Sequence, residues 1–310
     1  MKDDLNNYPQ KFNVLITSKC NLRCKHCYLD PRQTELSVKD FSSIIDYLKK
    51  IKIKELCIEG GEPLCHQYFD QICSSLLNLR CNKKIVTNAT LLTEEIVYLI
   101  DKTFDTVQVS IDGGTKEEYE IIRGKNSFSK LITGLNYLSK IKDKVQINFV
   151  LTALNYFQID KLFSLAREYG LYQFRFIYVV DFSGNIVPSE EIVLYFISKL
   201  LGLITIYKEA KINLVFPERV IHKYRDLLLS NKIENYVGIC YAGTVYTVID
   251  SDKIVYPCNF LVGKKPLFSF EPQSFYSEWQ RCVFFNNLRN DLQNKECEGC
   301  PANINCIDRG

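Results

Sequence analysis

The sequence predicts an α/β protein built on a parallel sheet with helices outside it. Strand-like and helix-like segments alternate six times between residue 12 and about residue 180, and this alternation is typical of parallel sheets. The chain has 310 residues, enough for one large domain and a smaller one. Its character changes after residue 210, where hairpin and cysteine patterns begin. Periodicity does not decide between an open sheet and one curled into a barrel.

Six strands are expected from short apolar runs: FNVLIT (12–17), ELCIE (55–59), KKIVT (83–87), TVQVSI (106–111), VQINFVL (145–151) and FRFIYVV (174–180). Helices are expected at 38–51 after Ser37, near 66–80, at 93–102, and in segments reaching about 141 and about 169. The apolar segment 192–207 follows Pro188-Ser189-Glu190-Glu191, which is typical of a helix start. It carries Lys199 and is shorter than a membrane span, so it is predicted to be a core helix.

A second, smaller α+β domain is predicted at 235–310, after a first domain at 10–210. The segments 244–249 and 253–257 flank Asp250-Ser251-Asp252 and indicate a hairpin. A helix is expected at roughly 274–290, before a polar tail that contains three cysteines.

Composition narrows the function classes. The net charge is +3 and no long Lys/Arg block occurs, so nucleic acid binding is not expected. The first eleven residues are polar and charged, so neither a signal peptide nor a membrane protein is expected. Thirteen cysteines without a secretory signal indicate metal or redox use in a reducing cytoplasm.

Cys20, Cys24 and Cys27 form a C-x3-C-x2-C pattern directly after the first expected strand. A tetrahedral zinc site needs four ligands, and His26 is adjacent to Cys27, so it is a poor fourth ligand. A [4Fe–4S] cluster also takes four ligands. Three local cysteines therefore leave one iron open to a non-protein ligand, with spare thiols or another metal as the alternatives.

This spacing, on the loop after the first strand, resembles the radical S-adenosylmethionine (radical SAM) family. The resemblance implies a partial (β/α)6 TIM-like barrel. It also implies that the open iron of a [4Fe–4S] cluster binds S-adenosyl-L-methionine (SAM). Reductive cleavage of SAM would leave a 5′-deoxyadenosyl radical that removes hydrogen from a substrate C–H bond, with an electron donor such as flavodoxin or ferredoxin as partner.

Further motifs support the resemblance, which covers roughly residues 10–180. Gly60, Gly61, Glu62 and Pro63 are similar to the family's GGEP segment, where the backbone and Glu62 would hold the amino group of SAM. Ser110 and Asp112 belong to a segment similar to SIDG, and Arg123 to one similar to IRG, where it would pair with the methionyl carboxylate. Thr87-Asn88-Ala89 is similar to TNG with alanine in place of glycine. Asn148 and Val150 are expected at the adenosine site from their register alone.

The C-terminal cysteines are expected to hold a second, auxiliary [4Fe–4S] cluster. A hairpin, a helix and a C-x2-C-x5-C run resemble the modules called SPASM and Twitch, but five cysteines allow only one complete cluster. The expected ligands are Cys240, Cys258, Cys297 and Cys300, with Cys306 competing for the last place and Cys282 expected in the core. A four-cysteine zinc site is the alternative.

The resemblance implies an oxidoreductase that oxidatively modifies a peptide, as a maturase does, by a crosslink or side-chain oxidation. Eleven residues precede the first strand, so a leader peptide is expected to bind a separate protein or the barrel mouth. The alternatives are dehydrogenation of a small-molecule alcohol such as an aminoglycoside intermediate, haem or cofactor biosynthesis, and a non-enzymatic zinc-binding protein. No catalytic acid or base is assigned. Arg175, Tyr178 and Asp181, on or just after the sixth strand, are candidates to face the mouth, with a structural role as the alternative.

Overall fold

The structure is a computed structural model. It describes residues 8–29, 33–181, 183–217, 220, 222–231, 233–235 and 242–293. Cys240, Cys297, Cys300 and Cys306 lie outside these residues, so the expected auxiliary ligands are represented only by Cys258.

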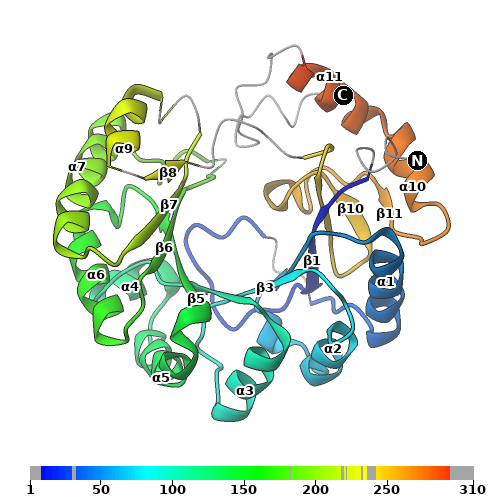
Figure 1. The fold of residues 1–310 in the computed structure, drawn as a ribbon, viewed down its shortest axis with the longest axis horizontal. Helices are drawn as coiled ribbons and strands as arrows, with labels where there is room; N and C mark the ends of the chain where they lie inside the picture. Colours follow the sequence, from blue (N-terminus) through cyan, green and yellow to red (C-terminus); the bar gives the residue numbers. More distant parts are fainter. Residues whose placement is uncertain are drawn as a thin grey trace.

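One parallel sheet forms the centre of the protein and curves into an arc with the helices on its outer side (Figure 1). Its successive strands are β1 (Lys11–Thr17), β2 (Glu55–Gly60), β3 (Asn82–Thr87), β4 (Thr106–Ser110), β5 (Val145–Leu151), β6 (Gln173–Tyr178) and β7 (Lys211–Val215). Each pairs in parallel with the next, and the two-residue β8 (Glu234–Asn235) pairs with β7. The expected partial barrel is confirmed, and it has a seventh strand that the sequence analysis did not identify.

The helices between strands are α1 (Val38–Ile51), α2 (Phe69–Leu76), α3 (Glu94–Thr103), α4 (Lys116–Arg123), α5 (Phe128–Leu138), α6 (Ile159–Glu168), α7 (Glu190–Ile206) and α9 (Arg225–Ser230). Short 3₁₀ turns occupy Pro63–Cys65, Ser139–Lys144, Tyr156–Gln158 and His222–Tyr224. The side chains of Ser37, Thr93, Thr115 and Ser189 cap helices by accepting backbone N–H bonds. No helix among the described residues is both long enough and apolar enough to cross a membrane.

The C-terminal hairpin continues the barrel sheet. It consists of β9 (Tyr246–Ile249) and β10 (Ile254–Tyr256), and β9 pairs in parallel with β1 while β10 pairs antiparallel with β9 and with β11 (Phe268–Ser269). A 3₁₀ turn (Asn259–Leu261) follows Cys258. The helix expected at 274–290 is two helices, α10 (Phe275–Arg281) and α11 (Val283–Gln293), because the backbone of Cys282 leaves the helical region (ψ 114°).

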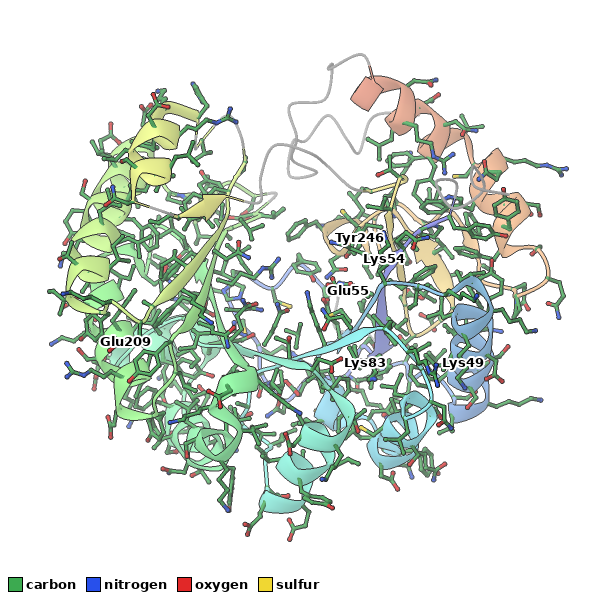
Figure 2. All side chains as sticks on the ribbon, viewed as in Figure 1. Lys49, Lys54, Glu55, Lys83, Glu209 and Tyr246 are labelled. Carbon is green, nitrogen blue, oxygen red and sulfur yellow. The ribbon has the colours of Figure 1, made fainter. Side chains whose placement is uncertain are left out.

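The two faces of the sheet differ in chemistry. In β6, Phe174 stacks on Phe163 of α6 (ring centroids 4.4 Å apart), and Phe176 meets Phe196 of α7 at 5.3 Å. Side chains alternate between the faces of a strand, so the residues between these apolar ones point away from the helices. We call that side the inner face. It carries polar residues: Asn13, Cys57, Glu59, Lys84, Gln108, Ser110, Gln146, Asn148, Arg175 and Asn213. Tyr246 and Glu55 lie on the inner side of the arc, whereas Lys49 lies on the outer helical layer (Figure 2).

The hairpin region and the start of the barrel share one hydrophobic core. Phe275 contacts residues of both regions in this core. Its ring is fully buried and packs on Phe12 of β1, Tyr47 of α1 and Phe270, at centroid distances of 5.8, 5.4 and 5.2 Å. We expect Phe275→Ala to lower the free energy of unfolding by about 3–5 kcal/mol, because it leaves a cavity between these elements. Urea denaturation followed by tryptophan fluorescence measures this change.

The matched control is Val283→Ala, whose side chain is 66% exposed. Its effect should stay within about 0.5 kcal/mol. A Phe275→Ala protein as stable as the control would show that the two regions do not depend on a common core.

Candidate active site at the carboxyl ends of the barrel strands

The loop after β1 carries the three cysteines of the C-x3-C-x2-C pattern. We call residues 18–29 the cysteine loop. Cys20 and Cys24 are half-buried and Cys27 is exposed. Burial, with smaller contributions from Glu62, Cys24 and Cys27, raises the pKa of the Cys20 thiol to about 11. The three thiols are therefore close enough to interact, although the described residues contain no cluster of three metal-ligating side chains already gathered. Three thiols on one loop are the donor set that an iron–sulfur cluster uses.

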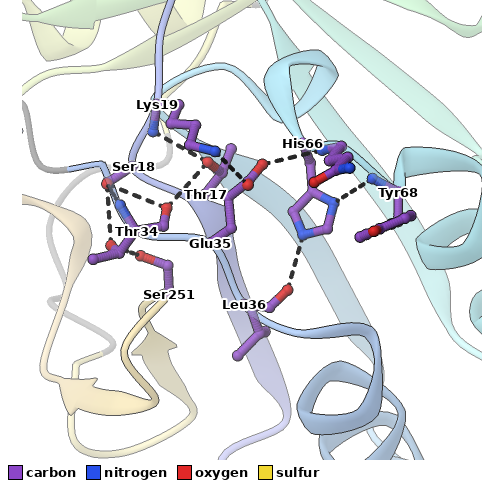
Figure 3. Close-up of polar contacts among 10 residues, drawn as sticks. Thr17, Ser18, Lys19, Thr34, Glu35, Leu36, His66, Tyr68 and Ser251 are labelled. Atoms are coloured by element: carbon purple, nitrogen blue, oxygen red, sulfur yellow. Dashed lines mark hydrogen bonds and ion pairs between the residues drawn. The ribbon is translucent and has the colours of Figure 1, made fainter.

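Hydrogen bonds close the neck of the cysteine loop (Figure 3). The Ser18 backbone N–H donates to the Thr34 carbonyl (2.9 Å), and the Thr34 hydroxyl meets that of Ser251 on the hairpin (2.6 Å). Lys19 pairs with Glu35, whose other oxygen accepts from the Gln67 N–H at 3.0 Å. These bonds fix the start of the cysteine loop to the Thr34–Glu35 segment, which in turn contacts the segment before α2 and the hairpin.

Buried His66 reinforces the same neck. Its Nε2 lies 2.8 Å from the Leu36 carbonyl, and its Nδ1 accepts from the Tyr68 N–H at 3.1 Å. Both ring nitrogens are therefore used in holding backbone, and His66 has a structural role.

Gly60 and Gly61 allow the backbone after β2 to touch the cysteine loop. A Cβ on Gly60 would lie 2.4 Å from the Thr17 carbonyl oxygen, and one on Gly61 would lie 2.4 Å from that of Lys19. In place of side chains there are two backbone bonds of 2.8 Å, from Gly61 N–H to Thr17 and from Glu62 N–H to Lys19. We call this contact the glycine clasp. It requires residues without a side chain, because no L-residue could approach so closely.

The side chain of Glu62 joins the clasp to the end of β3. It is 1% exposed, and its oxygens accept from the Thr87 hydroxyl and from the Asn88 backbone N–H, both at 2.7 Å. Burial raises the pKa of Glu62 to about 7, and these two hydrogen bonds act in the opposite direction. The Asn88 side chain then donates to Asn21 in the cysteine loop at 2.9 Å. The carboxylate that the motif analysis assigned to SAM is therefore engaged with the protein's own donors.

A buried ion pair fixes the other side of the cysteine loop. Asp112, fully buried after β4, accepts from Arg123 Nε at 2.5 Å and from the Val150 N–H of β5 at 2.7 Å. Arg123 Nη1 also lies 3.6 Å from the Cys24 sulfur. Burial disfavours the charge of Arg123, but Asp112, together with Cys24 and Tyr119, outweighs that effect and raises the Arg123 pKa. Asp112 and Arg123 thus place a positive charge beside a thiol.

Two further contacts complete this side. The Lys25 N–H donates to the Ile122 carbonyl at 2.9 Å. His26 Nε2 lies 3.8 Å from Asp112, and burial lowers the pKa of His26 to about 4. Its Nδ1 is buried without a partner among the described residues, as is the amide oxygen of Asn148. Such atoms are the points at which a bound molecule can donate or accept hydrogen bonds.

A second polar cluster on the inner face was not identified from the sequence. Glu59 accepts from the amides of Asn13 (2.6 Å) and Asn259 (2.5 Å), and Tyr246 donates to Asn259 at 2.7 Å. Burial raises the pKa of Glu59 to about 7. Burial also raises the pKa of Tyr28, which lies near Glu59, Cys27 and Cys258. The cluster therefore lies between the cysteine loop and the hairpin cysteine. Polar residues at alternate positions of otherwise apolar strands are the sequence feature that could have indicated this cluster.

The three residues on or after β6 differ in their surroundings. The Tyr178 hydroxyl donates to the Pro188 carbonyl (3.1 Å), and Asp181 accepts backbone N–H bonds from Ser183 and Ile186, so both organise their own loop. Arg175 alone lies on the inner face.

Comparisons with known proteins agree with this arrangement. Residues 14–166 match the model of the family described as the Radical SAM superfamily. The chain is 27% identical to an AdoMet-dependent heme synthase of Methanosarcina barkeri, covering 96% of this chain and 93% of that protein. It is also 27% identical to the mycofactocin maturase MftC of Mycolicibacterium smegmatis, covering 92% and 74%.

Solved structures share the fold. Streptococcus suis SuiB bound to the precursor peptide SuiA superposes with a TM-score of 0.77 at 20% identity, covering 91% of this chain and 67% of that one. The structure titled native anSMEcpe with bound AdoMet and Kp18Cys peptide gives 0.73 at 20% identity, covering 95% and 90%. At these identities the likeness concerns the fold alone.

The glycine clasp yields a matched pair of variants. Gly61→Ala should push the Lys19 backbone away and disturb the cysteine loop, because the added Cβ has no room. We expect it to lose iron after anaerobic reconstitution relative to the wild type, by up to about four irons, the content of one cluster. In Gly202→Ala, by contrast, the new Cβ would meet nothing within 4 Å, so the iron content should be unchanged and stability should rise by up to about 1 kcal/mol. Equal iron contents in the two variants would contradict the clasp.

The buried ion pair yields a second test. Asp112→Asn keeps an acceptor for Val150 but leaves Arg123 without its counter-charge, which should cost about 3–5 kcal/mol of unfolding free energy. The matched control, Asp101→Asn, removes the partner of Lys144 in a half-exposed ion pair and should cost about 0–1 kcal/mol. Chemical denaturation of both variants measures the change in unfolding free energy. A decrease for Asp112→Asn no larger than that for the control would refute the role of the ion pair.

Proposed function

We propose that the chain, whose residues 14–166 match the Radical SAM superfamily, is a radical SAM enzyme and that it oxidatively modifies a peptide. The observation that carries the first part is the cysteine loop held by the glycine clasp at the carboxyl ends of the strands. This rim is where α/β barrels keep their sites.

We propose that Cys20, Cys24 and Cys27 hold a [4Fe–4S] cluster. The proposed SAM site consists of Gly60, Gly61, Glu62, Pro63, Ser110, Asp112, Arg123 and Asn148. When bound, these cofactors supply the radical chemistry that removes a hydrogen atom from an unactivated C–H bond. The chain's own residues orient them. Glu62 braces the glycine clasp, and Arg123 places its charge beside Cys24.

We further propose an auxiliary [4Fe–4S] cluster in the region 235–310, with ligands from Cys240, Cys258, Cys297, Cys300 and Cys306. Support comes from Cys258, which is buried at the start of the 3₁₀ turn after β10 and lies close to Tyr28 and Tyr246 of the inner face. A redox centre there would adjoin the polar cluster around Glu59 and is suited to accept the electron left on a substrate.

A peptide substrate is supported by relatives whose names or titles mention one. They are the mycofactocin maturase, SuiB with its precursor peptide, and anSMEcpe with a bound peptide. The polar inner face offers the hydrogen-bonding groups that a peptide needs. The proposed partners are an electron donor such as flavodoxin or ferredoxin and, if the peptide carries a leader, a separate leader-binding protein. The cytoplasm is the proposed compartment.

Haem biosynthesis is the second candidate, and one observation favours it. The haem synthase relative aligns over 93% of its own length, against 74% for the mycofactocin maturase. The two candidate functions can be distinguished by the substrate that is converted. Incubation with a peptide encoded beside the gene should change that peptide's mass, whereas a haem synthase would convert a tetrapyrrole and leave the peptide unchanged.

One set of variants tests the chemistry. With dithionite and SAM, the anaerobically reconstituted wild type should release 5′-deoxyadenosine, detected by liquid chromatography and mass spectrometry. Changing Cys20, Cys24 and Cys27 together to Ala should reduce this release at least 100-fold, because the cluster ligands are removed. Cys81→Ala, at a half-buried cysteine before β3, should retain activity. Unchanged release from the triple variant would refute the assignment.

Iron, sulfide and zinc in the same triple variant test the auxiliary cluster. About four irons and four sulfides per chain should remain if the C-terminal region holds its own cluster. Zinc in place of iron would make that region structural and would remove the argument for net oxidation.

A further inference from the structure

Arg175 is a cation placed inside the arc of strands. It lies within β6 between Phe174 and Phe176, whose rings pack on the outer helices, so its side chain belongs to the inner face. The strand register sets it beside Asn148 of β5 and Asn213 of β7. Arg175 therefore stands in the middle of a row of three polar side chains on three adjacent strands.

The Arg175 guanidinium is in direct contact with no acid among the described residues. It makes no hydrogen bond or ion pair there, and burial lowers its pKa. The acid that acts on it most strongly is Glu59, whose two oxygens already accept from Asn13 and Asn259. A half-buried guanidinium that no acid contacts directly is unfavourable. Proteins keep such a group where a ligand supplies the missing charge.

The two flanking asparagines also lack hydrogen-bond partners for their amide oxygens within the described part of the chain. The amide oxygens of Asn148 and Asn213 are both buried, with no hydrogen-bond partner among the described residues. An asparagine amide rotated by 180° offers N–H donors in place of its oxygen. With both amides rotated in this way, the row presents a guanidinium fork with an N–H donor on each side, which is the arrangement that a planar, two-oxygen anion accepts.

We infer that Arg175, assisted by Asn213, binds a carboxylate group of the substrate on the inner face of the barrel. The inference rests on the proposed function in that the substrate enters the arc of strands. For a peptide, the group would be an Asp or Glu side chain or the chain's own C-terminus. Asn148 stands on the other side of Arg175, toward Ser110 and the proposed SAM site. Glu59 would repel a second anionic group, so the site selects one carboxylate.

The test is a titration that needs no turnover. The reconstituted protein, labelled with ¹⁵N-arginine, is titrated with acetate while the Nε–Hε signal of Arg175 is followed, assigned by its loss in R175K. We expect a saturable shift with a dissociation constant on the order of 10 mM, as suits a four-atom ligand. Acetamide, the neutral analogue, should produce no shift. Asn213→Asp should shift the Arg175 signal before any acetate is added and should abolish the response to acetate, because the new side chain supplies a carboxylate within the row.

The control is Arg167→Lys on the exposed face of α6, which should leave the acetate response unchanged. An unresponsive Arg175 signal in the wild type would overturn the inference, and this result does not depend on how any variant folds. Equal binding of inorganic phosphate would also overturn it, since the site would then attract any anion. So would a shift by SAM alone that blocks acetate, because the cofactor's carboxylate would then be the ligand.

The outcome is independent of the proposed chemistry. An acetate shift without formation of 5′-deoxyadenosine would refute the radical function and retain the carboxylate site. Formation of 5′-deoxyadenosine without the shift would do the reverse.

Discussion

The close backbone contact between Gly60–Gly61 and Thr17–Lys19 is the constraint on which the rest of the site depends. A loop carrying three thiols has little reason to fold by itself, since its side chains repel once ionised and it is short of apolar residues. The clasp replaces side-chain packing with two backbone hydrogen bonds. Glu62 carries the same restraint to Thr87 and Asn88 at the end of β3. Three consecutive segments of the rim are thus held in register before any cofactor binds, which is the preorganisation that a reactive centre needs.

Asp112 plays the corresponding part on the opposite side of the loop. One carboxylate oxygen fixes β5 through Val150, and the other fixes Arg123 at the end of α4. Because the pair is buried, removing either member leaves a charge in a medium of low polarity. The arrangement is therefore cooperative, and Cys24 lies at its edge. Burial raises the pKa of the Cys24 thiol, and the Arg123 guanidinium opposes that rise.

Much of the fold could be predicted because its signals are local. Six strands and the helices between them follow apolar periodicity and caps such as Ser37 and Thr93. The seventh strand, Lys211–Val215, was missed because only one of its five residues is fully buried. The place of the hairpin beside β1 could not be predicted either, since periodicity reports where strands are and not which strands pair. The alanine in Thr87-Asn88-Ala89 has a visible consequence. Ala89 adopts φ 61°, a conformation that favours glycine, and Gly134 approaches its carbonyl oxygen closely.

The candidate site also has features that the sequence predicts and features that it does not. Its motif residues converge because the carboxyl ends of parallel strands meet at one rim, and this much follows from sequence order. The hydrogen-bond partners of individual side chains do not follow from sequence order. Glu62 accepts from Thr87 and Asn88, and Arg123 donates to Asp112. The inner face was less visible still. Asn13, Glu59 and Arg175 are each one polar residue in an otherwise apolar strand, which in sequence is indistinguishable from a solvent-exposed position. Only the curvature of the sheet turns these three positions toward a common interior, where Glu59 accepts from two amide donors and Arg175 has no hydrogen-bond acceptor among the described residues. That asymmetry arises from curvature and register together, and it leaves the Arg175 guanidinium with no directly paired acid among the described residues, with Glu59 as the nearest attracting carboxylate.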